Sequence, residues 1–435
     1  MTAKATSSLT GTATAAPSTS IPPGITAVLN VCRRIYPTQP NPLQASPSVK
    51  FWLGGPDPLD YISMYLNAGA EHLAIPEHWH YVTFGLSDLY GDGRIHPLEE
   101  QHPDEMDVDG PISGFGFELT FRLKRAAGEL TPPLWPADFL QDLARYIFSS
   151  SNVFVPGDHV SWHRALDGGE NSQSKIQHVL MTTDPQMARV VSPSGRVEFV
   201  QAVGVCKEEL EAAQHWNGRG VLELLRSCKT ACGPMWITDI RRDRSIFELD
   251  SHLALSVQDG INRDGSDLSG VSCSCRWTEI RRHKHSRSGR SLSLSDTNQI
   301  RAALQNGLAD NDPSHIKFLD SVHLSFNQEA GSLLGLALCG RLLHGRHFTF
   351  RNVTTDHAIT FVAEEVRGTA VSRERPLAVA GNWLQVYLQE KDIMEMAADV
   401  RVLTMPEKFL PYRLFSWPNL RLNVTVCKDE TLFAI

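Results

Sequence analysis

The sequence predicts an α+β protein of two domains, a mixed α/β N-terminal domain and a β-rich C-terminal domain. The chain has 435 residues, which is longer than a single hydrophobic core usually supports. Helical and strand-like periodicities alternate through residues 24–262, whereas the last third consists mainly of strand-like runs. Hydrophobic residues make up 42% and charged residues 21%, as in ordinary soluble globular proteins.

The first half of the chain gives its elements in a clear order. Residues 1–23 form a Thr-, Ala- and Ser-rich tail with too little apolar content to fold, so we expect disorder there. Residues 24–36 show helical spacing, and residues 137–148 form a second apolar helix. We expect two short helices within 208–227, broken at Asn217-Gly218. Strands are predicted at 49–53, 78–86, 114–123, 176–182, 197–205 and 234–239, with 78–86 and 114–123 in one sheet.

The second predicted helix runs into the stretch 144–163, which the rest of the chain is organised around. Polar residues 149–152 end the helix, and residues 153–155 are extended. Pro156-Gly157 then turns the chain and presents Asp158 at the mouth of a short strand flanked by aromatic and histidine residues. A single acidic residue presented in this way indicates that Asp158 either binds a partner or takes part in a reaction.

The polar run 259–270 marks the boundary between the domains. We place the N-terminal domain at 24–262, a hinge at 263–270 and the C-terminal domain at 271–435. The C-terminal strands are predicted at 271–277, 321–326, 333–343, 347–353, 358–362, 383–388 and 420–427, with one helix at 393–400. A disordered loop is expected at 281–312. Its basic, Ser-rich start is a phosphorylation target at Ser288, Ser291 and Ser293, a localisation signal, or a solvated linker.

The net charge and the absence of targeting signals argue against a nucleic-acid-binding, membrane or secreted protein. The net charge of −8 argues against broad nucleic-acid binding, which needs a basic face. No apolar run is long enough to span a bilayer, and the N-terminus lacks the apolar core of a secretory signal. Eight scattered cysteines then indicate reduced thiols in the cytoplasm or nucleus.

Patterns that suggest catalysis or metal binding are weak. His78 and His80 share a strand face but lack further ligands, so we interpret them as sheet residues. The spacings Cys228-x-x-x-Cys232 and Cys273-x-Cys275 do not match paired zinc ligands, and we expect buried thiols. Gly114-Phe-Gly-Phe reads as a strand and not as a phosphate loop. A hydrolase or metal-dependent enzyme that uses Asp158 and His163 stays as the alternative to a binding protein without cofactor or metal.

Several longer runs resemble one family, Suppressor of fused, over about residues 24–430. They are FWLGGPDPLDYISMY (51–65), IPEHWHYVTFGLSDLYGDGR (75–94), SGFGFELTFRLKR (113–125), GDHVSWH (157–163), TDPQM (183–187), AQHWNGRG (213–220) and LLHGRHFTF (342–350). The resemblance implies a non-enzymatic negative regulator of Hedgehog signalling with two hinged domains. It implies that Gli/Ci-type zinc-finger transcription factors are held through a Ser-Tyr-Gly-His-Leu motif between the domains. The factors would be retained in the cytoplasm and repressed in the nucleus.

The resemblance also assigns residues and further partners. It places the contacts with the motif at Tyr146, Phe154, Asp158, Val271, Cys273 and Leu333. Thr183 stands where some relatives carry a glutamate, which weakens the case for that contact, and the short 281–312 loop carries no transferable regulatory site. A Fused-type kinase and a Hedgehog pathway scaffold are further expected partners of a monomeric protein. A motif bound as an added strand would gain main-chain hydrogen bonds, with Asp158 bonding its polar side chains.

Overall fold

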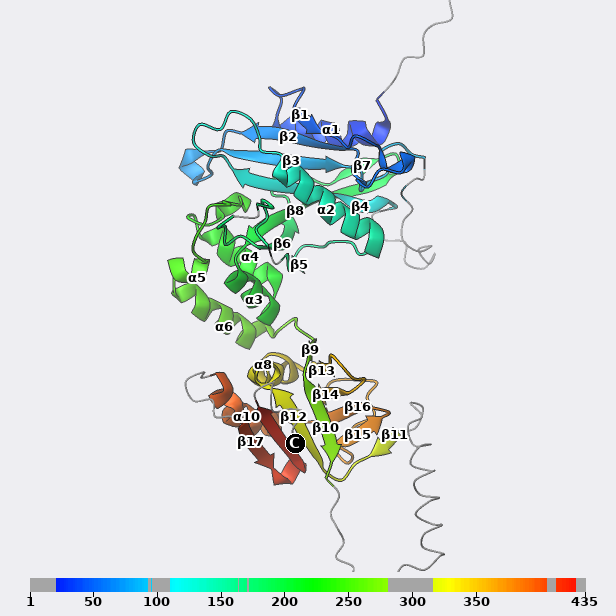
Figure 1. The fold of residues 1–435 in the computed structure, drawn as a ribbon, viewed down its shortest axis with the longest axis vertical. Helices are drawn as coiled ribbons and strands as arrows, with labels where there is room; N and C mark the ends of the chain where they lie inside the picture. The colour runs from blue at the N-terminus through cyan, green and yellow to red at the C-terminus, as the bar shows by residue number, and fades with distance from the viewer. Residues whose placement is uncertain are drawn as a thin grey trace, which may run out of the picture. The chain divides into compact units, whose positions relative to one another are not determined.

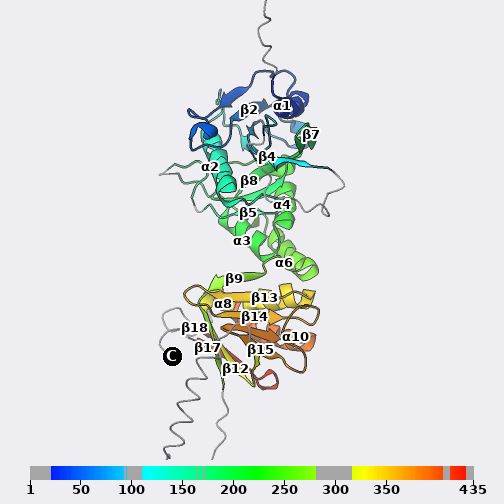
Figure 2. The ribbon, with the colours of Figure 1, turned by 90° about the vertical axis from the view of Figure 1, so that its right-hand side faces the viewer.

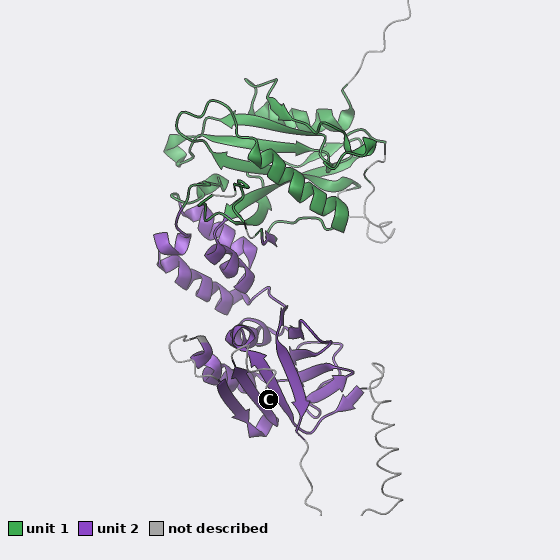
Figure 3. Ribbon diagram, in the orientation of Figure 1, with its two compact units in different colours: residues 1–158, 162–204, 229–242 green, residues 159–161, 205–228, 243–435 purple. Residues whose placement is uncertain are grey.

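The computed structural model describes residues 21–92, 95, 110–162, 164–169, 172–280, 316–404 and 412–427. The chain divides into two compact units, coloured separately in Figure 3. Unit 1 contains residues 1–158, 162–204 and 229–242, and unit 2 contains residues 159–161, 205–228 and 243–435. Helices and mixed sheets occur together, which confirms the α+β prediction. Among the described residues, no helix is both long and apolar enough to cross a membrane.

Unit 1 is built on a mixed sheet in which β1, β2, β3, β4, β8 and β6 follow one another in space. The pairs from β1 to β4 are antiparallel, β4 and β8 are parallel, and β7 forms a hairpin with β8. The strands are β1 (Leu43–Ala45), β2 (Tyr61–Asn67), β3 (His78–Phe84), β4 (Ile112–Lys124), β6 (His178–Thr183), β7 (Val190–Ser192) and β8 (Gly195–Val205).

Two helices cover opposite faces of this sheet, as Figures 1 and 2 show from perpendicular directions. The helix α1 (Pro23–Ile35) buries Val28, Val31 and Cys32 against β2, β3 and β8. The helix α2 (Trp135–Ser150) packs Phe139 edge-on against Phe121 of β4. Every residue of β3 is buried because the strand is covered on both faces.

Unit 2 contains a group of helices and two further sheets. The helices that pack on one another are α3 (Lys207–His215), α4 (Gly218–Ser227), α5 (Ile246–Leu249) and α6 (His252–Asp264). Asn217 caps α4 by accepting the Gly220 N–H at 2.6 Å, so the predicted break between two helices is confirmed. The first part of the polar run 259–270 is helical as the end of α6, and the domain boundary itself stays a prediction.

The two sheets of unit 2 share one hydrophobic core with the helices beside them. One sheet has the order β11-β15-β16-β14-β13-β9 and the other the order β10-β12-β18-β17. The strands are β9 (Gly270–Cys273), β10 (Cys275–Glu279), β11 (Ile316–Phe318), β12 (Val322–Asn327), β13 (Phe348–Asn352), β14 (Ala358–Val362), β15 (Leu377–Ala380), β16 (Trp383–Tyr387), β17 (Tyr412–Trp417) and β18 (Leu422–Cys427). The helices are α8 (Gln328–Ser332), α9 (Leu334–Leu336) and α10 (Glu390–Val400), and 2-residue β5 (His159–Val160) also belongs to this unit.

Three of the predicted strands are wrong. Residues 333–343 are helical instead, as α9 followed by a π turn (Ala337–Arg341) and a 3₁₀ turn (Leu342–His344). The run is eleven residues long and apolar except for Arg341, a case in which periodicity does not separate a buried helix from a strand. Just before this run, Gly331 lets α8 lie close to β18, because a Cβ there would lie 2.3 Å from Val426 Cγ1.

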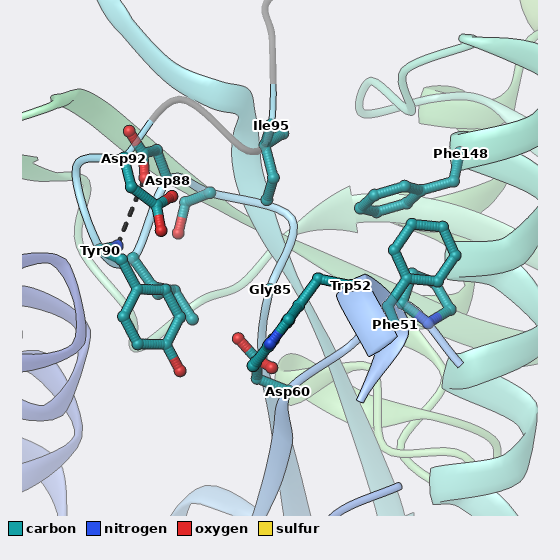
Figure 4. A pocket seen from close by; sticks show the side chains of 12 residues that line it. Phe51, Trp52, Asp60, Gly85, Asp88, Tyr90, Asp92, Ile95 and Phe148 are labelled. Atoms are coloured by element: carbon teal, nitrogen blue, oxygen red, sulfur yellow. Dashed lines mark hydrogen bonds between the residues drawn. The ribbon is translucent and has the colours of Figure 1, made fainter. Parts of the chain in front are cut away.

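The other two wrong strands are broken by glycine. Residues 51–53 form a 3₁₀ turn because Gly54 is left-handed with a φ of 89° and the Gly55 N–H folds back to the Lys50 carbonyl. Residues 233–235 form another, and only Thr238 of the predicted strand 234–239 bridges to β4. The 3₁₀ turn at 51–53 leaves Phe51 and Trp52, beside the pocket shown in Figure 4, with 43% and 47% of their surface exposed.

Candidate partner-binding site

Tyr146 and Phe154 form an aromatic pair at the end of α2. Their rings stack with centroids 5.8 Å apart and an interplanar angle of 20°. Phe154 is buried, whereas Tyr146 is 46% exposed, and its hydroxyl accepts a hydrogen bond from Asn152 Nδ2 at 2.8 Å. An exposed ring backed by a buried ring gives a firm, flat surface with a polar tip, which suits contact with a peptide.

Asp158 stands at the end of the Pro156-Gly157 turn, as predicted from the sequence. Its Oδ2 accepts the Val155 N–H at 2.9 Å, and its own N–H donates to the Val155 carbonyl at 3.0 Å. The Gly157 N–H and the Asp158 carbonyl both bond to the main chain of Met181, at 2.7 and 2.8 Å. Oδ1 has no hydrogen-bond partner among the described residues. The turn therefore holds the carboxylate by one oxygen and leaves the other available to a ligand.

A cavity of about 450 Å³ lies beside Phe154. Phe115 lines one side, and the exposed side chains of Val153 and Val155 line another. Thr183 also lines the cavity, at the end of β6. Apolar surface of this kind, next to a fixed carboxylate, extends the area that unit 1 offers to a partner.

The predicted contacts in unit 2 gather around β9. Cys273 is buried in the core of this unit, and the half-buried Val271 and Leu333 pack against the same core. Leu333 does not lie on a strand as predicted but links α8 to α9, with helical backbone angles. All three residues thus belong to, or pack against, the one hydrophobic core of the two sheets of unit 2.

Strand β9 is the terminal strand of its sheet among the described strands. It runs parallel to β13, and the N–H groups of Thr349 and Val353 donate to the carbonyls of Ser269 and Cys273, each at 3.0 Å. Because main-chain direction alternates along a strand, Gly270 and Ser272 point their N–H and C=O groups to the other side. Ser272 is exposed at this edge of the sheet, and no other described strand pairs with β9 on that side.

Sequence reasoning missed this edge. The run 271–277 was predicted as one strand, but it contributes β9 and β10 to two different sheets, with Ser274 between them. The period of two was visible, whereas the position of β9 at an edge depends on pairing with β13, about eighty residues later. Gly270 fits this close pairing, because a Cβ there would lie 2.5 Å from the Thr349 carbonyl oxygen, but that requirement comes from the distant strand and could not be read from the local sequence.

The thiol of Cys273 is suited to packing and not to nucleophilic chemistry. A hydrogen bond with Cys275 and burial raise its pKa well above the ordinary value, so it stays neutral. Each cysteine of the chain that the structure describes is a free thiol, which agrees with the sequence-based interpretation.

His78 and His80 belong to a buried polar network in unit 1 and confirm their interpretation as sheet residues. His80 lies 2.8 Å from the Tyr36 hydroxyl through Nδ1 and 3.0 Å from Asp184 Oδ2 through Nε2. His78 lies 2.8 Å from the Pro76 carbonyl through Nδ1, and its Nε2 accepts from Arg122 at 2.9 Å. These partners assign one donor and one acceptor to each neutral ring.

The network also fixes the charges within it. Arg122 donates to Asp184 Oδ1 at 2.9 Å and to Gln201 Oε1 at 3.0 Å. Burial acts to raise the pKa of Asp184, but Arg122 and His80 lower it well below its usual range. Burial and the nearby Arg122 charge lower the pKa of His78 to about 3 and that of His80 to about 4. The site is therefore a satisfied structural core with no open coordination position.

The enzyme alternative gains no support from the described residues. No group of three metal-ligating side chains occurs among them. His163, the second residue of that hypothesis, lies outside the described residues, as do Ser288, Ser291, Ser293 and the loop 281–312.

Comparison with known proteins identifies the family. Residues 55–243 match the family model described as Suppressor of fused protein, and residues 255–426 match the model of the Suppressor of Fused Gli/Ci N terminal binding domain. The Suppressor of fused homologs of Homo sapiens and Mus musculus are each 50% identical over 455 aligned positions, covering 93% of this chain and 92% of theirs.

Solved structures agree with these matches. The crystal structure of Drosophila Suppressor of Fused superimposes with a TM-score of 0.76 at 34% identity, covering 94% of this chain and 98% of that one. A chain of the Sufu-Fu complex crystal structure gives a TM-score of 0.51 at 44% identity, covering 55% of this chain and 99% of that one. The fold is thus that of a two-domain regulatory scaffold protein. The chain belongs to the Suppressor of fused family.

Proposed function

We propose that this chain is a negative regulator of Hedgehog signalling that binds Gli/Ci-type zinc-finger transcription factors. A Ser-Tyr-Gly-His-Leu motif binds as a strand added to the open edge of β9, and the surface formed by Tyr146, Phe154 and Asp158 contacts it from unit 1. The monomeric protein retains the factor in the cytoplasm and represses it in the nucleus. A family model described as a Gli/Ci binding domain, matched by residues 255–426, supports this choice of partner.

The observation that carries the proposal is the edge of β9. An added strand would pair with the outward main-chain groups of Gly270 and Ser272. Alternate side chains of that strand would fall on the face where Val271, Cys273 and Leu333 pack. Burial of the leucine of the motif against this apolar area contributes about 1.5–3 kcal/mol.

Asp158 supplies the polar specificity in the proposal. Oδ2 is held by the Val155 N–H, so Oδ1 is the oxygen that would accept from the histidine or serine of the motif. A hydrogen bond to a charged group contributes about 1.5–3 kcal/mol, which corresponds to roughly a 10- to 150-fold change in the dissociation constant. The Sufu-Fu complex among the similar structures supports a Fused-type kinase as a further partner.

The test is a titration of the full chain with a labelled motif peptide. Ser272→Pro removes an N–H that points away from β13, so the ladder of the sheet stays intact while the added strand loses a donor. We expect at least tenfold weaker binding, with Ser272→Ala as a matched control that binds like the wild type. Asp158→Asn keeps the shape of the side chain and removes its charge, and we expect a similar loss.

A second measurement uses the ligand and leaves the protein unchanged. N-methylation at successive positions of the peptide should weaken binding at alternate residues only, because a strand faces its neighbour with every second N–H group. Uniform tolerance of N-methylation, or wild-type affinity for a folded Ser272→Pro protein, would rule out strand addition at β9. Turnover of a generic ester that is lost in Asp158→Asn would instead favour the enzyme alternative.

A further inference from the structure

Arg341 is buried at the end of the π turn that follows α9, although its side chain carries a permanent charge. Only 7% of its surface is exposed. Burial and the neighbouring Arg346 charge both lower its pKa, so this position is unfavourable for the charge itself. No carboxylate among the described residues forms an ion pair with Arg341. Other bonds must therefore explain why the side chain lies there.

The guanidinium of Arg341 bonds two main-chain carbonyls from distant parts of the chain. Its Nη1 donates to the Ser266 carbonyl at 2.8 Å, and its Nε donates to the His347 carbonyl at 3.1 Å. Ser266 lies shortly before Gly270, where β9 begins, and His347 immediately precedes β13. Because β9 and β13 run parallel, the guanidinium forms an additional rung between the two segments just ahead of their ladder.

The segment that leads into β9 is tied down by further bonds within unit 2. The fully buried Ser266 donates its N–H to the Gly340 carbonyl at 2.7 Å, and its Oγ accepts the Leu268 N–H at 3.1 Å. The Asp267 N–H donates to the Trp216 carbonyl at 2.8 Å. Both main-chain groups of Ser266 and its hydroxyl oxygen thus have partners, so the Arg341 rung is attached to a fixed point.

Strand β9 needs such an anchor because it is short and paired on one side. It has four residues, and among the described strands only β13 pairs with it. The ends of a terminal strand open more readily than the middle of a sheet, because they make fewer bonds and less buried contact. Gly270, one of the two residues that direct main-chain groups outward, is the first residue of β9. Loss of the rung would therefore loosen this edge first.

We propose that Arg341 is a positioning residue of the motif site. It acts through the backbone of β9, because its rung holds the start of the strand on β13 and keeps the outward groups of Gly270 and Ser272 in line. Lysine does not replace it, because an ammonium acts as a point charge whereas the planar fork reaches two carbonyls at once. The inference rests on the function proposed above and adds a residue that holds the site without touching the motif.

The first measurement needs no ligand. Amide hydrogen exchange in the full chain, followed by NMR, reports on the Thr349 N–H, which bonds the start of β9, and on the Val353 N–H, which bonds its end. We expect Arg341→Met and Arg341→Lys to speed exchange at Thr349 about tenfold, with a smaller change at Val353. The Leu388 N–H, which bonds β14 in the same sheet, should keep its rate.

The second measurement is the affinity for the labelled motif peptide. Arg341→Met and Arg341→Lys should each weaken binding about tenfold. Arg346→Met is the matched control, because Arg346 Nη1 also donates to the Ser266 carbonyl, at 3.1 Å, but its side chain does not bond the His347 carbonyl. Its affinity should change less than about twofold. Val424→Ala removes buried atoms from the core of unit 2 at β18 and should also bind like the wild type.

A double-mutant cycle separates positioning from general destabilisation. Because Arg341 acts through the edge of β9, Arg341→Met should weaken binding little further once Ser272→Pro is present. In combination with Asp158→Asn, which lies in unit 1, the two losses should multiply. If Arg341→Met does not fold, Arg341→Lys enters the same cycle, since it keeps the buried charge and removes only the fork.

Three results would overturn the proposal. They are unchanged exchange at Thr349 in the Arg341 variants, losses that multiply with Ser272→Pro, and wild-type affinity in Arg341→Lys. Absence of peptide binding by the wild type would instead reject the function proposed above. The exchange rates then still decide whether Arg341 anchors β9, because they are measured without the peptide.

Discussion

Acidification from pH 7.5 to pH 5 is expected to destabilise unit 1 through the buried pair His78 and His80. Both rings are neutral in the fold, and the Nε2 of His78 accepts a hydrogen bond from the permanently charged Arg122. A proton on that nitrogen would place two donors against each other in a site without water contact. The unfolded chain has no such constraint, so its histidines take up protons near pH 6.5.

The magnitude follows from the lowered pKa values. Because the folded pKa values of His78 and His80 are about 3 and about 4, the stabilisation is complete above pH 6.5 and decreases as the pH falls below it. Between pH 7.5 and pH 5 each histidine costs about 2 kcal/mol, or about 4 kcal/mol together. Asp184, whose pKa is lowered, contributes only below about pH 4 and does not affect this interval. A loss of this size is a large part of a typical domain stability of about 5–15 kcal/mol.

The measurement is urea unfolding followed by fluorescence at the two pH values. His78→Gln removes one titrating ring, and its amide can still donate to the Pro76 carbonyl and accept from Arg122. We expect the loss between pH 7.5 and pH 5 to be about 2 kcal/mol smaller in this variant than in the wild type. Equal free energies of unfolding at both pH values, or the same pH dependence in the wild type and His78→Gln, would refute the reasoning.

Three further predictions concern other parts of the chain. Glu118→Ala should lower the free energy of unfolding by about 3–5 kcal/mol, because several buried donors of residues 83–87 lose their acceptor, each at a cost of about 1–3 kcal/mol. Gly260→Ala should destabilise the protein by about 1–3 kcal/mol, although alanine favours helices, because its Cβ would lie 2.3 Å from Trp216 Cε2. Thermal unfolding of both variants checks these signs. Deletion of 281–296 should leave the affinity for the motif peptide unchanged, and a loss of binding on titration would show that the loop takes part.

The sequence predicted the elements whose periodicity is long and regular. The strands β3 and β4, the helices α1 and α2, and the two helices around Asn217 were all expected near their observed bounds. The short strands β15 and β17 were not predicted. The errors at 49–53 and 234–239 arose at Gly54 and Gly233, whose positive φ angles end extended structure within apolar runs.

Of the candidate site, the sequence could predict the part that depends on local structure. The turn that fixes Asp158 is local, so Pro156-Gly157 was enough to indicate it. The open edge of β9 depends on pairing with distant residues, which no local pattern carries. The charge network around Arg122 likewise joins residues more than sixty positions apart.

The shortness of β9 has a consequence for self-association. Exposed sheet edges invite pairing with a second copy, and long flat edges promote aggregation. Within β9 only Gly270 and Ser272 direct main-chain groups outward. At the next outward-facing residue, Ser274, the carbonyl already accepts a hydrogen bond from the Asn327 N–H. A ligand of a few extended residues can use every bond that this edge offers, whereas a long strand from a neighbouring molecule gains nothing beyond it. The short length of β9 (Gly270–Cys273) therefore suits a short ligand and limits edge-to-edge polymerisation.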